Sequence, residues 1–386
     1  GVWVGPTLPP SGRVVPRRLA ARRDVPWQAA VAAGGLVAAA VAVWVTLESD
    51  FLAHPGWLAA QKADFILGPV FVGLYWMRQR PESRYGPMLI AFGAVGAVYI
   101  LHSSSNRWLY STGVVWELMI YLGSLLLILT FPPGRLDGPA AKLIMVAGFP
   151  VSVMYVMVVL LLPQLGPDGS ISGCAGMCPE NVLAVTSNPA LAVDLYRLIR
   201  VVVIAQAIAT AGLLVWRMIT GTPPQRRALA IGTPIALVFL LCQITYQSLH
   251  LVEADGAFLE WVQWALAGAR SLMWYAFLLA LVAAQLFAGR ALHRLVRQSL
   301  RRPSRRELET MLREPLGDPD LRLLFVDAES ESGATPAGDG AVEVLERGHG
   351  RQVTIVERGD GTPGVAINHD ALLADDPELL RAAGAV

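Results

Sequence analysis

The chain has 386 residues, of which 54% are hydrophobic and only 16% are charged; its formal net charge is +1 and its mean hydropathy is +0.49. These values exclude an ordinary soluble globular protein and predict a membrane protein. Three cysteines are too few for a disulfide scaffold.

A basic arm, residues 1–25, precedes a series of apolar segments. Read in windows of about 19 residues, the sequence predicts roughly eight transmembrane helices between residues 26 and 288. The second is the weakest, because Gln61, Lys62 and Asp64 occupy its first half. The predicted spans are 27–46, 57–76, 88–101, 113–131, 144–162, 195–216, 229–251 and 261–287.

Arginine and lysine alternate between successive connections, as correct threading of an even number of spans requires. The opposite connections contain only Arg107. We therefore expect a multi-pass protein of the plasma membrane with both termini in the cytoplasm. The basic residues on the predicted cytoplasmic side before the last span are Arg17, Arg18, Arg22, Arg23, Arg78, Arg80, Arg84, Arg135, Lys142, Arg217, Arg226 and Arg227.

The seventh predicted span carries a polar stripe in its outer half. Gln243, Tyr246, Gln247 and His250 recur at i, i+3, i+4 and i+7, which places them on one face of a helix. Polar residues within a span require partners or a function. The stripe predicts either interhelical hydrogen bonding or a stimulus pocket. Candidate partners at a similar depth are Glu117, Arg197, Arg200 and Arg270, and the predicted stimulus pocket consists of the stripe with Glu117, Arg200 and Arg270.

The predicted outer loop, residues 163–194, contains the sequence CAGMCPEN. A disulfide between Cys174 and Cys178 is plausible outside the cytoplasm. Redox or metal sensing and two free thiols are the alternatives, although no His or further Cys lies nearby to complete a zinc site.

The last span continues without proline into the basic sequence AGRALHRLVRQSLRR, residues 288–302. Arg290, Arg294, Arg297 and Arg301 recur at helical spacing, with leucine and valine between them. This juxtamembrane helix, residues 289–303, is predicted either to relay movement to the cytoplasm or to be an ordinary basic membrane flank.

Residues 304–386 have the composition of a small α/β module. The pattern predicts a helix from Ser304 to Pro315, strands at 321–326, 342–345, 352–356 and 364–367, and a final helix starting near Asp376. The last two strands are expected to form a hairpin. His369 and Asp370 resemble a phosphoacceptor pair, but they follow a predicted strand and precede a predicted loop, so we expect no phosphate transfer there.

Several segments together resemble the input halves of actinobacterial sensor histidine kinases: RPESRYGPMLIAFG, LTFPPGRL, CAGMCPEN, AGRALHRLVRQSLRRP, LGDPDLRLLFV and VAINHDALLADDPELL. The resemblance implies a following dimerisation helix, an ATP-binding domain that uses ATP and Mg²⁺, a homodimeric full-length protein and a cytoplasmic response regulator. We find no phosphoacceptor or ATP-binding motif in these residues and assign no catalytic, cofactor or metal residue.

We therefore expect a sensor and signal-transmission portion that is inactive as a kinase by itself and does not bind nucleic acid directly. A multi-span transporter and a non-enzymatic membrane scaffold are the alternatives. The stimulus is not identified by the sequence.

Overall fold

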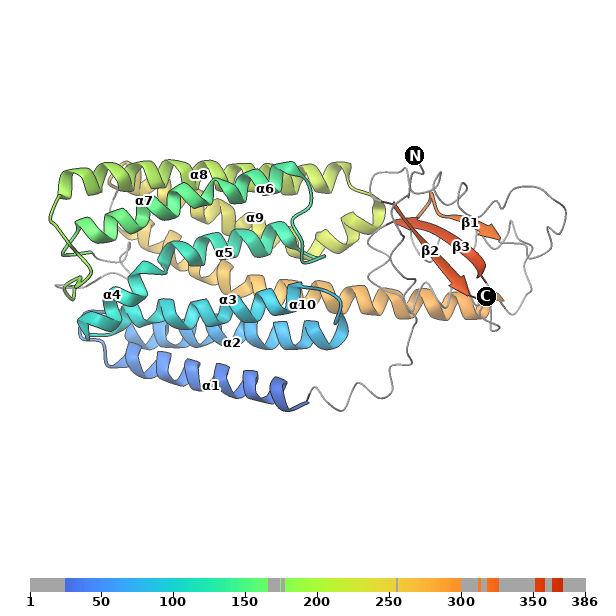
Figure 1. Ribbon diagram of the computed structural model, residues 1–386, viewed down its shortest axis with the longest axis horizontal. Helices are drawn as coiled ribbons and strands as arrows, with labels where there is room; N and C mark the ends of the chain where they lie inside the picture. The colour runs from blue at the N-terminus through green and yellow to red at the C-terminus, as the bar shows by residue number, and fades with distance from the viewer. Residues whose placement is uncertain are drawn as a thin grey trace, which may run out of the picture.

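The computed structural model describes residues 25–165, 174, 178–254, 256–299, 312–313, 318–325, 351–357 and 363–370. Its helices lie side by side in one elongated bundle, and a small sheet lies beyond one end of that bundle (Figure 1). The helices are α1 (Val25–Leu47), α2 (Pro55–Gln79), α3 (Tyr85–Tyr99), the 3₁₀ turn η2 (Ile100–Ser103), α4 (Arg107–Val115), α5 (Glu117–Thr130), α6 (Pro139–Val146), α7 (Gly148–Leu161), α8 (Pro189–Thr220), α9 (Pro223–Leu251) and α10 (Ala257–Ser299).

Seven helical segments within the described residues are long and apolar enough to cross a membrane. They correspond to every predicted span except the second, which is α2. α2 is nevertheless a 25-residue helix with a hydrophobic buried face. α2 is not among the segments that are apolar enough to span by composition, and its interior carries Lys62 and Asp64.

Two of the predicted spans are not single helices. The fourth is divided at Trp116 into α4 and α5, and the fifth is divided at Ala147 into α6 and α7. Gly148 and Pro150 follow the second division directly, whereas Trp116 itself is neither proline nor glycine. The side chain of Asn106 caps the start of α4 by accepting hydrogen bonds from the amides of Trp108 and Leu109, at 2.9 and 3.4 Å.

α10 occupies the middle of the bundle. It packs along α9 on one side and α2 on the other, while α8 covers α9 and both α1 and α3 cover α2. Several large aromatic side chains on α10 and α2 are completely buried, among them Trp274, Phe277 and Trp76. Because α10 touches both halves of the bundle, it is the helix best placed to respond to a change in either half.

The long helix predicted across the membrane boundary is present. α10 is continuous for 43 residues, and its last part extends beyond the bundle at the end where the sheet lies (Figure 1). Arg290 is exposed there, and Arg294 and Arg297 belong to the same helix. Arg301 lies outside the described residues.

The sheet contains three described strands, β1 (Arg322–Phe325), β2 (Arg351–Glu357) and β3 (Pro363–Asp370), in the order β1-β3-β2. Both pairings are antiparallel, so the predicted hairpin between the last two strands is present. Within the predicted helix 304–315 only residues 312–313 are described, and these are helical. The predicted strand 342–345 and the final helix fall outside the described residues.

The position predicted for His369 was wrong in one respect. His369 and Asp370 do not follow the last strand; they form its end, because β3 is longer than the predicted 364–367. Both residues are buried. His369 Nε2 lies 2.8 Å from the hydroxyl of Thr354 on β2, and His369 Nδ1 lies 2.7 Å from the carbonyl oxygen of Asp370. These contacts give His369 a structural role within the sheet.

Candidate functional site

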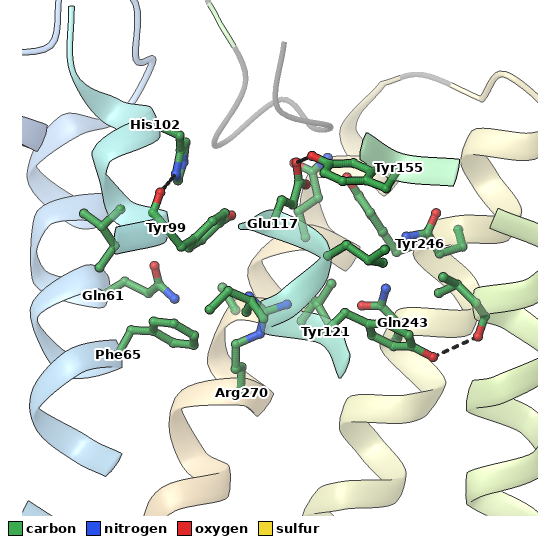
Figure 2. A pocket seen from close by; sticks show the side chains of 18 of the residues that line it. Gln61, Phe65, Tyr99, His102, Glu117, Tyr121, Tyr155, Gln243, Tyr246 and Arg270 are labelled. Atoms are coloured by element: carbon green, nitrogen blue, oxygen red, sulfur yellow. Dashed lines mark hydrogen bonds between the residues drawn. The ribbon is translucent and has the colours of Figure 1, made fainter. Parts of the chain in front are cut away.

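A cavity of about 160 Å³ lies inside the helical bundle. Its lining comes from α2, α3, η2, α5, α7, α8, α9 and α10, so helices from both ends of the sequence meet around it (Figure 2). The lining residues belong to the helix ends opposite the sheet. In particular, Arg270 lies in the first half of α10, whereas the sheet lies beyond its last part (Figure 1).

Six of the seven residues predicted to form the stimulus pocket line this cavity. They are Gln243, Tyr246, Gln247, Glu117, Arg200 and Arg270. The seventh, His250, does not line it, because it lies one further turn along α9, almost at the end of the helix. Its ring instead packs edge-on against Tyr246 at 4.6 Å between centroids. Arg197, considered with the other partners, lies at the surface and pairs with Glu253 at 2.9 Å.

One wall of the cavity was missed in the sequence. Gln61, Lys62 and Phe65 of α2 line it, together with Tyr99 and His102 from α3 and η2. Lys62 is only 4% exposed and donates a hydrogen bond from Nζ to the hydroxyl of Ser103. Two of the three polar residues that weaken the second predicted span, Gln61 and Lys62, therefore line the cavity, whereas Asp64 does not. Polar residues within an otherwise apolar segment were the signal for this wall.

Glu117 begins α5 and lies at the cavity beside Tyr155 of α7 (Figure 2). The hydroxyl of Tyr155 lies 3.0 Å from Oε2 of Glu117 and 2.9 Å from the carbonyl oxygen of Val114. Tyr121, one helical turn after Glu117, donates a hydrogen bond of 2.9 Å to the carbonyl oxygen of Val203 on α8. These bonds connect α5 to α7 and α8 around the site.

Arg270 links the two halves of the bundle. Its guanidinium carbon lies 5.7 Å from the ring centroid of Phe65 on α2 and 5.8 Å from that of Phe239 on α9. Such contacts between a cation and an aromatic face are stabilising, more so where water is excluded. A group that binds Arg270 would therefore act on the helix that packs between α2 and α9.

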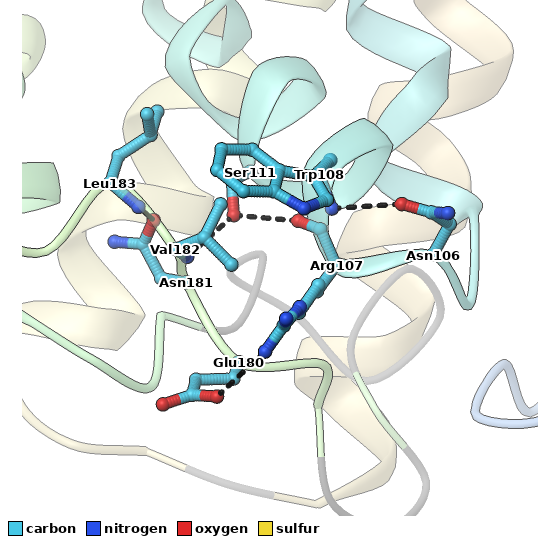
Figure 3. Close-up of polar contacts among 8 residues, drawn as sticks. All are labelled: Asn106, Arg107, Trp108, Ser111, Glu180, Asn181, Val182 and Leu183. Atoms are coloured by element: carbon cyan, nitrogen blue, oxygen red, sulfur yellow. Dashed lines mark hydrogen bonds and ion pairs between the residues drawn. The ribbon is translucent and has the colours of Figure 1, made fainter.

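At the end of the bundle opposite the sheet, α4 lies beside residues 180–183 of the connection from α7 to α8 (Figure 3). Ser111 of α4 accepts a hydrogen bond of 3.0 Å from the amide of Val182 and donates one of 2.8 Å to the carbonyl oxygen of Arg107. Asn181 is 4% exposed, and its side-chain Nδ2 donates hydrogen bonds to the carbonyl oxygens of Val159 and Leu162 at 2.6 and 2.8 Å. In its described segments 162–165 and 178–188, the connection is therefore held to α4 and α7 by hydrogen bonds.

The same connection contains the two close cysteines. Cys174 and Cys178 are joined by a disulfide, and Cys174 also forms a single antiparallel bridge to Leu52, between α1 and α2. In the described part of the chain, His, Cys, Asp and Glu residues form no group of three or more that could hold a metal ion.

No family model, curated protein or solved structure matches this chain. The fold and the site define a helical bundle, with seven helices apolar and long enough to span a membrane among the described residues, around an internal cavity whose lining includes polar and charged side chains. The resemblance to sensor histidine kinases stays a prediction.

Proposed function

We propose that this chain is the input and signal-transmission portion of a membrane sensor of the two-component histidine kinase type. In this proposal the cavity receives the stimulus and α10 carries the response to the cytoplasm. The observation that carries the proposal is that one uninterrupted helix, Ala257–Ser299, both lines the cavity and extends beyond the bundle. From Arg270 to Ser299, α10 is roughly 44 Å long at 1.5 Å per residue.

The packing along α10 supports a mechanical connection. One turn after Arg270, Trp274 is fully buried against Phe65 and Phe92, with ring centroids 6.1 and 5.0 Å away. Phe277 follows and stacks on Phe131 at 4.7 Å. Because close-packed interiors transmit displacement rather than absorb it, movement of Arg270 would be passed along these contacts.

A second connection joins the bundle to the sheet. The hydroxyl of Thr222, immediately before α9, donates a hydrogen bond of 2.5 Å to Oδ2 of Asp370 on β3. The amide of Asp370 in turn donates to Oδ2 of Asp318 at 2.9 Å. The sheet is thus fastened to α9 while α10 passes it, so relative movement of α9 and α10 would be felt by the sheet.

The proposal includes eight spans, with α2 as the eighth and both termini in the cytoplasm. At 25 residues α2 is roughly 37 Å long, which exceeds a hydrocarbon core of about 30 Å. Its charged residues have partners: the buried Lys62 bonds to Ser103, and Asp64 accepts a hydrogen bond from Tyr275 of α10 at the exposed face of the bundle. Charged side chains that have partners are compatible with a span.

Transport is the second candidate function, favoured by one observation. Two consecutive apolar segments are each divided at a single residue, Trp116 and Ala147, and Glu117 at the first division lines the cavity. Discontinuous helices around a central polar site occur in secondary transporters. Transport predicts that the protein moves a solute across the membrane of a liposome, whereas a sensor binds without net movement.

The proposed sensor is tested with the intact gene product in its own cells, by measuring phosphohistidine across a range of growth media. We expect the double variant Gln243→Leu, Gln247→Leu to respond less to the medium than the wild type. Leu241→Ala is the control on the same helix, because Leu241 is 63% exposed on the outside of α9. Absence of phosphohistidine, or an unchanged response of the double variant at normal expression, would contradict the proposal.

A further inference from the structure

The charges that line the cavity do not balance. Within its described lining there are three cationic side chains, Lys62, Arg200 and Arg270, and one carboxylate, Glu117. Formally this leaves two positive charges in excess. Charges removed from water are costly unless opposite charges accompany them. The lining is therefore complementary to an anion.

Two of these cations contact neutral groups of the lining. Lys62 donates to the hydroxyl of Ser103, and the guanidinium of Arg270 lies over the rings of Phe65 and Phe239. The Nε atom of Arg270 is buried and has no hydrogen-bond partner among the described residues. A guanidinium group presents several N–H donors in a planar arrangement that matches the oxygens of a carboxylate or phosphate.

Two further polar atoms of the lining are buried without a hydrogen-bond partner in the described part of the chain. They are Oε1 of Gln247 and Nε2 of His102. Because Nδ1 of His102 lies 2.6 Å from a carbonyl oxygen, Nδ1 carries the proton and Nε2 is an acceptor. Both atoms can accept hydrogen bonds from a ligand, and buried polar groups are normally satisfied.

From the charge excess and these unpartnered atoms we propose that the cavity binds a small molecule or headgroup bearing a carboxylate or phosphate. Its oxygens bind Arg270, with Lys62 supplying further positive charge, and its hydrogen-bond donors reach Gln247 and His102. The cavity volume of about 160 Å³ limits the bound part to a compact group. This inference rests on the proposed function, since it identifies the chemical class of the stimulus.

The test is thermal unfolding of the purified chain in neutral detergent at constant ionic strength. The soluble probes are acetate, succinate, benzoate and inorganic phosphate, with acetamide and benzamide as uncharged counterparts. Nanodiscs of phosphatidylglycerol or phosphatidylcholine test the lipid source. We expect at least one anionic probe to raise the melting temperature of the wild type, and its uncharged counterpart to have no effect.

Arg270→Gln should weaken the apparent affinity for that probe by at least about tenfold, the value expected for loss of a hydrogen bond to a charged group. Arg290→Gln is the matched control, because Arg290 is exposed on the same helix outside the cavity. Gln247→Glu places a carboxylate in the cavity and should also abolish the effect while leaving all three cations in place. It keeps the test valid if Arg270→Gln does not fold.

An effect of soluble anions identifies a solute, and an effect confined to phosphatidylglycerol identifies a lipid headgroup; either supports the inference. The inference is overturned if no anionic probe raises the melting temperature, or if the rise is the same in Arg270→Gln and Gln247→Glu as in the wild type. It is also overturned if the uncharged amides raise the melting temperature as much as the acids do. Altered phosphohistidine output in cavity variants without anion binding would refute this inference alone. Anion binding without any effect on output would refute the proposed function alone.

Discussion

The contact between α2 and α10 provides a sensitive test of how tightly α10 is packed. A Cβ atom added at Gly68 would lie 2.7 Å from Cδ1 of Trp274. Carbon atoms make favourable contacts at about 3.5–4.0 Å, so the two helices would have to separate by roughly 1 Å or Trp274 would have to move. Trp274 is 0% exposed, and Phe65 and Phe92 restrict its movement.

Overpacking of this kind typically costs about 1–3 kcal/mol, so Gly68→Ala should lower the melting temperature. One kcal/mol corresponds to roughly 2–4 °C in chains of 150–250 residues and to less in a longer chain. The assay is thermal unfolding in detergent, followed by intrinsic tryptophan fluorescence. Gly268→Ala is the control, since nothing lies within 4 Å of a Cβ added at this position on α10.

For Gly268→Ala we expect an unchanged or higher melting temperature, because alanine favours helix by about 1 kcal/mol over glycine. The close packing of α2 against α10 would be refuted if Gly68→Ala were as stable as Gly268→Ala. Equal destabilisation by both substitutions would likewise show that the effect does not arise at Trp274.

Three further changes test other parts of the structure. Asn181→Ala should destabilise the protein by about 1–3 kcal/mol, because it leaves buried carbonyl groups unsatisfied. The control Glu180→Gln removes an exposed ion pair of 3.9 Å and should cost less than about 1 kcal/mol. Equal denaturation midpoints of the two variants would contradict this prediction. Thr222→Val should increase hydrogen exchange in residues 363–370, and Thr220→Val, whose hydroxyl bonds only within its own helix, should not. Reduction with dithiothreitol should lower the melting temperature of the wild type but not of Cys174→Ser, and an equal response of both would show that the disulfide does not stabilise the loop.

The polar stripe of α9 could be predicted because helical periodicity is a local property. Gln243, Tyr246 and Gln247 share a face at any packing of the helix, and the structure places that face toward the cavity. The same periodicity could not show where the cavity ends. His250 continues the stripe but lies outside the cavity, because the neighbouring helices determine where the cavity ends.

The wall formed by α2 and η2 depends on contacts between residues distant in sequence. Lys62 bonds to Ser103 across 41 positions, and a single sequence contains no direct signal for that contact. The division at Trp116 was missed for a similar reason, since no proline or glycine occupies that position. Hydropathy predicted the seven apolar segments of the described residues because every helix that faces lipid needs an apolar surface. The polar residues of α2 depend instead on the helices that pack against it.

The central claim is that the state of the cavity is coupled to the part of α10 outside the bundle. Spin labels at Arg290→Cys on α10 and Ile219→Cys near the end of α8, both exposed, would report their separation by pulsed electron resonance after Cys242 is replaced by serine. Coupling predicts that Gln247→Glu, which places a carboxylate in the cavity, shifts the distribution of distances between the two spin labels relative to the protein with Gln247. Identical distributions for Gln247→Glu, Arg270→Gln and the unsubstituted cavity would contradict the claim.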